Sequence, residues 1–427
     1  MSAPAATLTK LLAWRPGGYL RASGALFGWL AVRTLAQTAL FVLVARTLGA
    51  DGYGVFITAI AIVGLFSFAA MGATSVLVKE GTRCPERLTE LTGDLLRYWA
   101  CATPVLSLVA VGVCVLLLGK SLPISALTAI ALAEIMCATA VDAVGRLYQS
   151  QGRLQRMGAT FCGLIFFRLV FFLLMTPLAA WTAKRWAWGY FVSSLVFLIV
   201  LLLSDRRLLR GFRVSTLPIG ALVRHALPFA FYNVAYKAQG ELNKPTLAHL
   251  AGFQSAGIFS AAHRCIDIVV FPTIALIEAM VPRIYRASHP LRAAAILGLA
   301  PFGLTLLGGG LLAGAAGWLP QLLGSSYNSA VLMTQTLAGL PALLVVRVIL
   351  GVVMSSYNLQ DWFLIVHGSG LVALIAFLWI LVPAFGALGA VIAAYALEAF
   401  LIAAQLVVIS KSGIRSSISF VGSGDAV

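Results

Sequence analysis

The sequence predicts an all-α polytopic membrane protein with about twelve transmembrane helices, arranged as two parallel six-helix lobes around a central cavity. Three observations support this fold class: the composition, a succession of long apolar runs, and an internal repeat. Of the 427 residues, 61% are hydrophobic and 10% charged, and the mean hydropathy is +0.97. A soluble domain is about half apolar and about one quarter charged. The bilayer is therefore the expected solvent for this chain.

Crossing a hydrocarbon core of roughly 30 Å takes about 20 apolar residues in a helix. A transmembrane β-barrel would instead show alternating segments of about ten residues, whereas the apolar runs here are continuous. Twelve such runs lie between polar breaks, at 23–46, 53–78, 96–118, 123–145, 159–179, 186–204, 226–249, 255–281, 291–316, 330–356, 362–382 and 386–409.

The longest polar stretch, about 205–225, separates six predicted spans from six. We therefore expect an N-terminal lobe at 1–210 and a C-terminal lobe at 211–427. The two halves also repeat: Gly49-Ala-Asp-Gly-Tyr-Gly-Val-Phe56 aligns with Gly252-Phe-Gln-Ser-Ala-Gly-Ile-Phe259 at an offset of 203 positions. Six spans separate the copies, so the repeats are parallel, with a pseudo-two-fold axis along the membrane normal.

The basic residues predict the orientation of the chain. Lys and Arg total 30 against 14 Asp and Glu, for a net charge of +16. Twenty of the 30 fall in the N-terminal segment and in the loops on its side of the membrane, and four fall on the opposite side. By the positive-inside rule both termini are cytoplasmic. This distribution explains the basic balance without a nucleic-acid partner.

The other six basic residues fall within spans, together with six acids. A charge at the bilayer centre costs at least about 2.5–3.5 kcal/mol, so such residues usually face a bundle interior or an aqueous cavity. The bases are Arg33, Arg168, Lys237, Lys244, Arg264 and Arg347. The acids, each a structural partner, cavity lining or a proton carrier, are Glu134, Asp142, Glu241, Asp267, Glu278 and Glu398.

Two explanations of these charges are open. Internal pairing would join Lys237 with Glu241, Arg264 with Asp267, and Asp142 with Arg146. It leaves Arg33 and Arg347 without an acid nearby in the sequence. A cavity with excess cations is the more economical explanation, and it favours a phosphate-bearing anion.

Within this cavity Arg33, Lys237, Lys244, Arg264 and Arg347 are the candidate substrate-binding residues, and Asp142, Glu241, Asp267 and Glu278 the coupling or lining residues. At the repeat offset Lys237 maps to position 34, beside Arg33, so the first helix of each half brings a cation to similar depth. Arg168 either belongs to the interior or snorkels to the cytoplasmic surface.

The sequence shows no catalytic or cofactor motif. Gly119-Lys120-Ser121 resembles the end of a phosphate-binding loop, but Cys114 stands where that loop requires glycine. The six cysteines form no CxxC pair and no Cys/His cluster, and we expect neither a disulfide framework nor a metal. The predicted outer loops are short. We therefore expect a transporter with no cofactor rather than an enzyme.

Three segments resemble a known family. Ala45-Arg-Thr-Leu-Gly-Ala-Asp-Gly-Tyr-Gly-Val-Phe56 is similar to the signature after the first helix of polysaccharide-type lipid-linked oligosaccharide flippases, in the multidrug/oligosaccharidyl-lipid/polysaccharide exporter superfamily. Ala256-Gly-Ile-Phe-Ser-Ala-Ala-His-Arg264 resembles the family's Gly-x-Tyr-Ser-x-Ala segment, with Phe259 in place of Tyr. Gly386-Ala-Leu-Gly-Ala-Val-Ile-Ala393 resembles the last helix.

The resemblance implies a multi-pass protein of the bacterial inner membrane. It would move an undecaprenyl-pyrophosphate-linked oligosaccharide to the outer leaflet by alternating access, driven by protons or membrane potential. The implied partners are the lipid-linked glycan, membrane lipid, a polysaccharide polymerase and glycosyltransferases. The family pattern carries over to Arg33, Lys237 and Glu241. Two alternatives stay open: a cation- or proton-coupled antiporter of small organic solutes, and an integral-membrane glycan polymerase or ligase.

Overall fold

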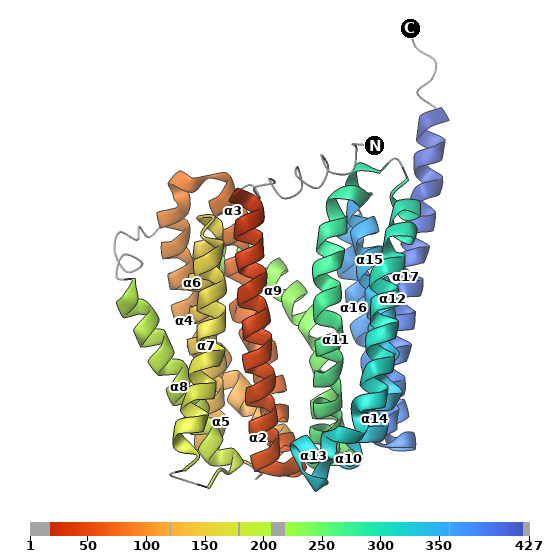
Figure 1. Cartoon of the computed structure of the whole chain (residues 1–427). Coiled ribbons are helices and arrows are strands. Elements are labelled where there is room, and N and C mark those ends of the chain that lie inside the picture. The colour runs from red at the N-terminus through yellow and green to blue at the C-terminus, as the bar shows by residue number, and fades with distance from the viewer. Residues whose placement is uncertain are drawn as a thin grey trace, which may run out of the picture.

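The computed structural model describes residues 18–119, 121–177, 180–205, 218–287, 289–357 and 359–421, and the regular structure in these ranges is helical throughout. Figure 1 shows two bundles side by side, with the N-terminal half from red to yellow and the C-terminal half from green to blue. The start of α2 and the end of α17 lie at the same end, which the charge distribution predicts to be cytoplasmic. Helices satisfy their own backbone hydrogen bonds, which a lipid environment requires.

The helices of the N-terminal half follow the predicted spans. They are α2 (Gly18–Ala70), α3 (Gly72–Arg83), η1 (Pro85–Arg87), α4 (Leu88–Leu118), α5 (Ile124–Ala131), η2 (Leu132–Ala138), α6 (Thr139–Ser150), α7 (Leu154–Met175) and α8 (Ala183–Ser204). Segment η2 is a π-helix within one continuous helical rod from α5 to α6.

The C-terminal half has the same general plan. Its helices are α9 (Ile219–Glu241), α10 (Asn243–Ala251), α11 (Phe253–Arg286), α12 (Pro290–Ala315), η4 (Ala316–Trp318), α13 (Leu319–Leu323), η5 (Ser325–Tyr327), α14 (Ala330–Leu337), α15 (Leu340–Ser356), α16 (Gln360–Phe385) and α17 (Ala387–Val421).

The predicted fold class is confirmed. Ten helices among the described residues are long and apolar enough to cross a membrane. The first of them, in α2, joins two predicted spans across Gly49, and α9 with α10 forms the more polar seventh span, which gives about twelve. The predicted lobe boundary at 210 falls within 206–217, outside the described residues.

The repeat is visible in the backbone. Gly49 and Gly252, 203 positions apart, both take positive φ angles, of 67° and 85°, where the chain reverses. The helices that follow cross at Gly54 and Gly257. A Cβ on Gly54 would lie 1.8 Å from the carbonyl oxygen of Phe253, and a Cβ on Gly257 would lie 2.1 Å from that of Ala50. These two contacts are related by the same offset, so the halves meet in a reciprocal pseudo-symmetric crossing.

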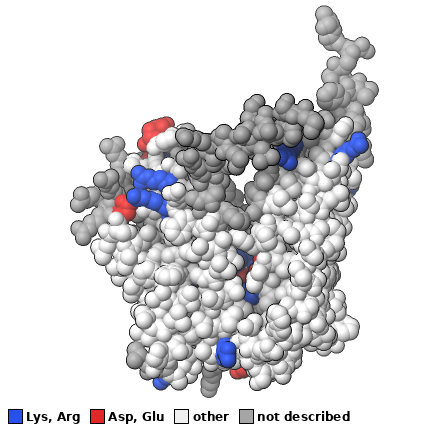
Figure 2. All heavy atoms as spheres, in the orientation of Figure 1, with Lys and Arg blue, Asp and Glu red and all other residues white. Residues whose placement is uncertain are grey.

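Further contacts join the halves at this predicted outer end, where α10 and α13 lie in Figure 1. The hydroxyl of Tyr327, a fully buried residue, donates to the carbonyl oxygen of Ala45 at 3.3 Å. The amide of Ala50 donates to the Ser326 hydroxyl at 3.3 Å. Towards the predicted cytoplasmic end α2 and α11 diverge (Figure 1), and Figure 2 shows a hollow between the bundles with basic and acidic atoms inside it. The structure is therefore closed at the outer end.

Candidate functional site

The seventh span carries three charged side chains at its interruption. Pro245 lacks the N–H that would bond to the carbonyl of Glu241, and the helix is broken at Leu242 between α9 and α10. Glu241 accepts from Lys237 at 2.8 Å through one carboxylate oxygen and from Lys244 through the other. The predicted Lys237–Glu241 pair is confirmed, and Lys244 shares the same acid. One carboxylate thus bridges two ammonium groups.

Helix α11 contributes a second group of charges. The guanidinium of Arg264 lies beside the hydroxyl of Tyr53, from the second half of α2. Asp267 lies 3.8 Å from Nδ1 of His263, one turn earlier. The suggested pairing of Arg264 with Asp267 is not found among the ion pairs of the described residues. The side chain of Asp267 is 57% exposed, so most of it faces open space.

Arg347, which has no acid nearby in the sequence, has an acid partner on another helix. Nε of Arg347, on α15, donates to Glu398, on α17, at 2.6 Å, and both side chains are largely buried. The two residues are 51 positions apart, so helical spacing gave no signal for this pair. Their contact depends on how α15 and α17 pack.

These groups line one cavity of about 430 Å³. The lining includes six of the predicted site residues, Lys237, Glu241, Lys244, Arg264, Asp267 and Arg347. A second pocket of about 240 Å³ lies between α2 and α11 and shares Gln37, Arg264 and Asp267 with the cavity. The two spaces are therefore contiguous, and the central hollow in Figure 2 contains charges of both signs.

The charge of the cavity comes from the C-terminal half. At the repeat offset Lys237, Glu241 and Lys244 correspond to Thr34, Thr38 and Phe41, which line the smaller pocket. The equivalent face of the first helix is therefore uncharged. The pseudo-symmetric backbone carries an asymmetric electrostatic surface.

Arg33 and Asp142 lie apart from the cavity in this conformation. The Arg33 guanidinium lies 5.7 Å from the ring centre of Phe161 on α7, and that of Arg146 lies 5.9 Å from the same ring. The predicted Asp142–Arg146 pair is confirmed at 3.5 Å. The first-helix cation thus belongs to a cluster within the N-terminal half. The side chain of Glu278 is outside what the structure describes.

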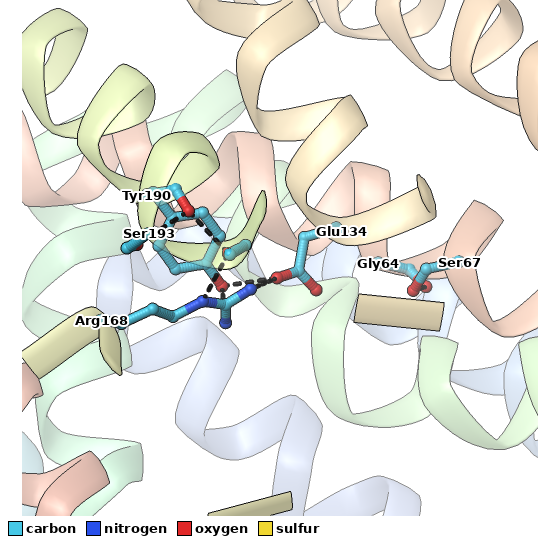
Figure 3. A network of polar contacts seen from close by, with 7 residues as sticks. Gly64, Ser67, Glu134, Arg168, Tyr190 and Ser193 are labelled. Atoms are coloured by element: carbon cyan, nitrogen blue, oxygen red, sulfur yellow. Dashed lines mark hydrogen bonds and ion pairs between the residues drawn. The ribbon is translucent and has the colours of Figure 1, made fainter. Parts of the chain in front are cut away.

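Arg168 belongs to the interior, so the snorkelling alternative is wrong. Its side chain is 5% exposed and pairs with Glu134 at 3.2 Å (Figure 3). It also donates to Ser194 and to the hydroxyl of Tyr190, which in turn donates to Glu134 at 2.5 Å. Glu134 stands on the π-helical segment η2. This buried network ties three helices of the N-terminal half, and no local spacing in the sequence predicts it.

Comparisons with known proteins show the family and the fold of this chain. The family model described as "Polysaccharide biosynthesis protein" matches residues 24–288. No curated protein matches the sequence.

Three solved structures show the fold. An inward-facing multidrug resistance MATE family transporter of the MOP superfamily has a TM-score of 0.69 at 15% identity, over 94% of this chain and 100% of that one. The lipid II flippase MurJ, in an inward closed conformation, has a TM-score of 0.65 at 10% identity, over 95% and 93%. A MOP superfamily transporter from Pyrococcus furiosus, described as having reverse polarity of its binding pocket, has a TM-score of 0.60 at 15% identity, over 93% and 95%.

With a family model that covers more than half of its length and a bundle that has the MOP superfamily fold, this chain belongs to the polysaccharide biosynthesis protein family.

Proposed function

We propose that this membrane transporter is a flippase for an undecaprenyl-pyrophosphate-linked oligosaccharide. It would move its cargo from the cytoplasmic to the outer leaflet by alternating access, for surface polysaccharide biosynthesis. The observation that carries the proposal is the cavity of the C-terminal half, with four basic and three acidic side chains around one space. Family membership supplies the glycan context.

The charges favour an anionic headgroup. Lys237, Lys244, Arg264 and Arg347 line the cavity. Ammonium and guanidinium groups bind phosphate through charge-assisted hydrogen bonds, and a desolvated site strengthens them. Lys237 and Arg264 are the first candidates for the pyrophosphate. Arg347 has Glu398 to itself, whereas Lys237 shares Glu241 with Lys244, and Arg264 is in none of the ion pairs of the described residues.

The smaller pocket suggests a route for the lipid tail. It lies between α2 and α11, and Phe41, Ile268 and Phe271 line it together with the shared polar residues. A headgroup bound in the cavity would extend its carrier through this gap into lipid. The polar part of the cargo would then cross in water while the polyprenyl chain stays in the membrane.

The proposal places the protein in the bacterial inner membrane with both termini cytoplasmic. The hollow between α2 and α11 then opens to the cytoplasm, where lipid-linked glycans are assembled. Glycosyltransferases would supply the cargo, and a polysaccharide polymerase would use it after translocation.

A complementation experiment tests this function. In a strain that lacks the chromosomal gene, we expect Lys237→Ala and Arg264→Ala each to reduce surface glycan by at least about tenfold, because a hydrogen bond to a charged group contributes about 1.5–3 kcal/mol. Lipid-linked glycan should accumulate in the inner leaflet. Arg185→Ala, on an exposed side chain at the predicted outer end, is the control for expression and charge. Normal export by a Lys237→Ala/Arg264→Ala double variant at normal membrane level would refute the headgroup site.

A second candidate is a cation- or proton-coupled antiporter of small organic solutes. The exposed carboxylate of Asp267 in the cavity favours it. Uptake of a cationic dye into vesicles separates the two functions: Asp267-dependent dye transport without any defect in glycan export would support the antiporter. Polymer-length analysis tests whether the protein transports glycan or transfers glycosyl groups. A flippase defect lowers the amount of polymer and leaves its linkage unchanged.

A further inference from the structure

The Glu241 carboxylate has the surroundings of a bound phosphate. Its two oxygens accept from two different ammonium groups, one turn away on either side, at 2.8 Å for Lys237 and in a short contact for Lys244. The Lys244 side chain is 7% exposed, so its charge is held in a largely dehydrated position. A buried ammonium requires a counter-ion. Glu241 supplies it.

Other charged and titratable groups face the same space. From α9 there is Tyr236, from α11 His263, Arg264 and Asp267, from α15 Arg347 and from α17 Glu398. Four of these already have partners: Arg347 binds Glu398, and His263 lies beside Asp267. Glu241 is thus the acid whose displacement would release two cations at once.

An additional polar group points to a ligand at this place. Asn243, next to the helix interruption, is 3% exposed and lines the cavity, yet its Oδ1 accepts no hydrogen bond within the described part of the chain. A buried oxygen that accepts no hydrogen bond is unfavourable. A protonated phosphate or a hydroxyl of the cargo would satisfy it.

We propose that Glu241 is an internal substitute for the cargo phosphate: a phosphate group binds Lys237 and Lys244 in its place, and the released carboxylate takes up one proton. The inference rests on the proposed function and adds a stoichiometry of one proton taken up for each cargo bound. A carboxylate that loses both ammonium partners in a dehydrated site takes a proton, because its charged form is then poorly solvated. The proton comes from the aqueous buffer, and no bond of the cargo changes.

The charge balance follows from this exchange. With Glu241 ionised, the bridge contributes one net positive charge from two lysines. With Glu241 protonated, both lysine charges are available to a phosphate dianion. Cargo and proton would therefore bind together on the cytoplasmic side and leave together on the outer side, so each exported cargo molecule would carry one proton outward.

Calorimetry on the purified full-length protein tests this. Inorganic pyrophosphate is titrated in buffers of different ionisation enthalpy, which gives the protons taken up per ligand bound. We expect about one proton more for the wild type than for Glu241→Gln, and binding to Glu241→Gln that is tighter by roughly 5- to 150-fold, the usual range of coupling between two sites. Equal proton uptake by the two proteins, or weaker binding to Glu241→Gln, would overturn the inference.

Asp267→Asn is the matched control, because it removes one negative charge from the same cavity without touching either lysine. We expect it to keep the proton uptake of the wild type. Loss of uptake in Asp267→Asn to the same extent would show a general charge effect and contradict the bridge. A second arm uses nanodiscs with and without undecaprenyl phosphate, which distinguishes a lipid headgroup from a free phosphate as the ligand.

Infrared difference spectroscopy on the wild type makes the test independent of variant folding. Pyrophosphate should produce the carbonyl band of a newly protonated carboxyl group, and its absence at saturation would overturn the inference. The glycan-export experiment tests a separate proposal. If export requires Lys237 and Arg264 but pyrophosphate leaves Glu241 ionised, the proposed flippase function is supported and the proposed exchange of Glu241 for phosphate is refuted.

Discussion

The reciprocal glycine crossing gives a quantitative prediction for conformational equilibrium. In Gly54→Ala the new Cβ would lie 1.8 Å from the carbonyl oxygen of Phe253, whereas ordinary contacts begin at 3.4 Å. The crossing must therefore open by about 1.6 Å, the difference between these two distances. Overpacking of this kind costs about 1–3 kcal/mol. The Cβ is fixed to the backbone of α2 and the oxygen belongs to the backbone of α11, so no side-chain rotation can relieve this overlap.

This cost falls on the conformation that is closed at the outer end. A penalty of about 1–3 kcal/mol shifts a two-state equilibrium roughly 5- to 150-fold. The assay labels a Ser260→Cys variant with a membrane-impermeant maleimide from outside intact cells, in a background where Cys84 and Cys101 are replaced by serine. Ser260 lines the cavity and is 1% exposed. We expect faster outside labelling when Gly54→Ala is added.

Gly64→Ala is the control, since it lies in the same helix and a Cβ there meets nothing within 4 Å. Gly257→Ala should reproduce the effect of Gly54→Ala, because its Cβ would lie 2.1 Å from the carbonyl of Ala50. If Gly54→Ala and Gly64→Ala label at the same rate, the crossing does not hold the outer end closed and the reasoning is refuted.

Three further predictions concern buried contacts. Arg168→Leu should lower the free energy of unfolding by about 3–5 kcal/mol, because it leaves Glu134 charged without its partner. Tyr190→Phe removes a hydrogen bond to the charged Glu134 and should lower it by about 1.5–3 kcal/mol. Equal melting temperatures of the two variants in detergent would contradict this order. Arg347→Ala should destabilise more than Arg347→Met combined with Glu398→Gln, which leaves no charge unpaired; a double-mutant cycle with no coupling would count against the pair. Tyr327→Phe removes the hydroxyl that donates to the carbonyl oxygen of Ala45, and the loss of this hydrogen bond costs about 1 kcal/mol. It should therefore raise outside labelling of the Ser260→Cys variant by less than Gly54→Ala does.

Local sequence patterns predicted the features that depend on one helix. Apolar runs gave the membrane spans, since a helix in lipid needs nothing from its neighbours to satisfy its backbone. The spacing of Lys237, Glu241 and Lys244 placed them on one face, and the structure joins them. The repeat at Gly49 and Gly252 predicted two related halves, and in the structure both glycines take the positive φ angles that this residue adopts readily.

Tertiary structure decided the contacts between helices. Arg347 pairs with Glu398 and Arg168 with Glu134 across gaps of 51 and 34 positions, which no helical period connects. Arg33 is next to a position equivalent to Lys237, but its side chain meets Phe161 instead of the cavity. The composition of the spans determined that charges lie within the membrane. The rotation and packing of each helix decided which of them face the cavity, because neighbouring residues on a helix point about 100° apart.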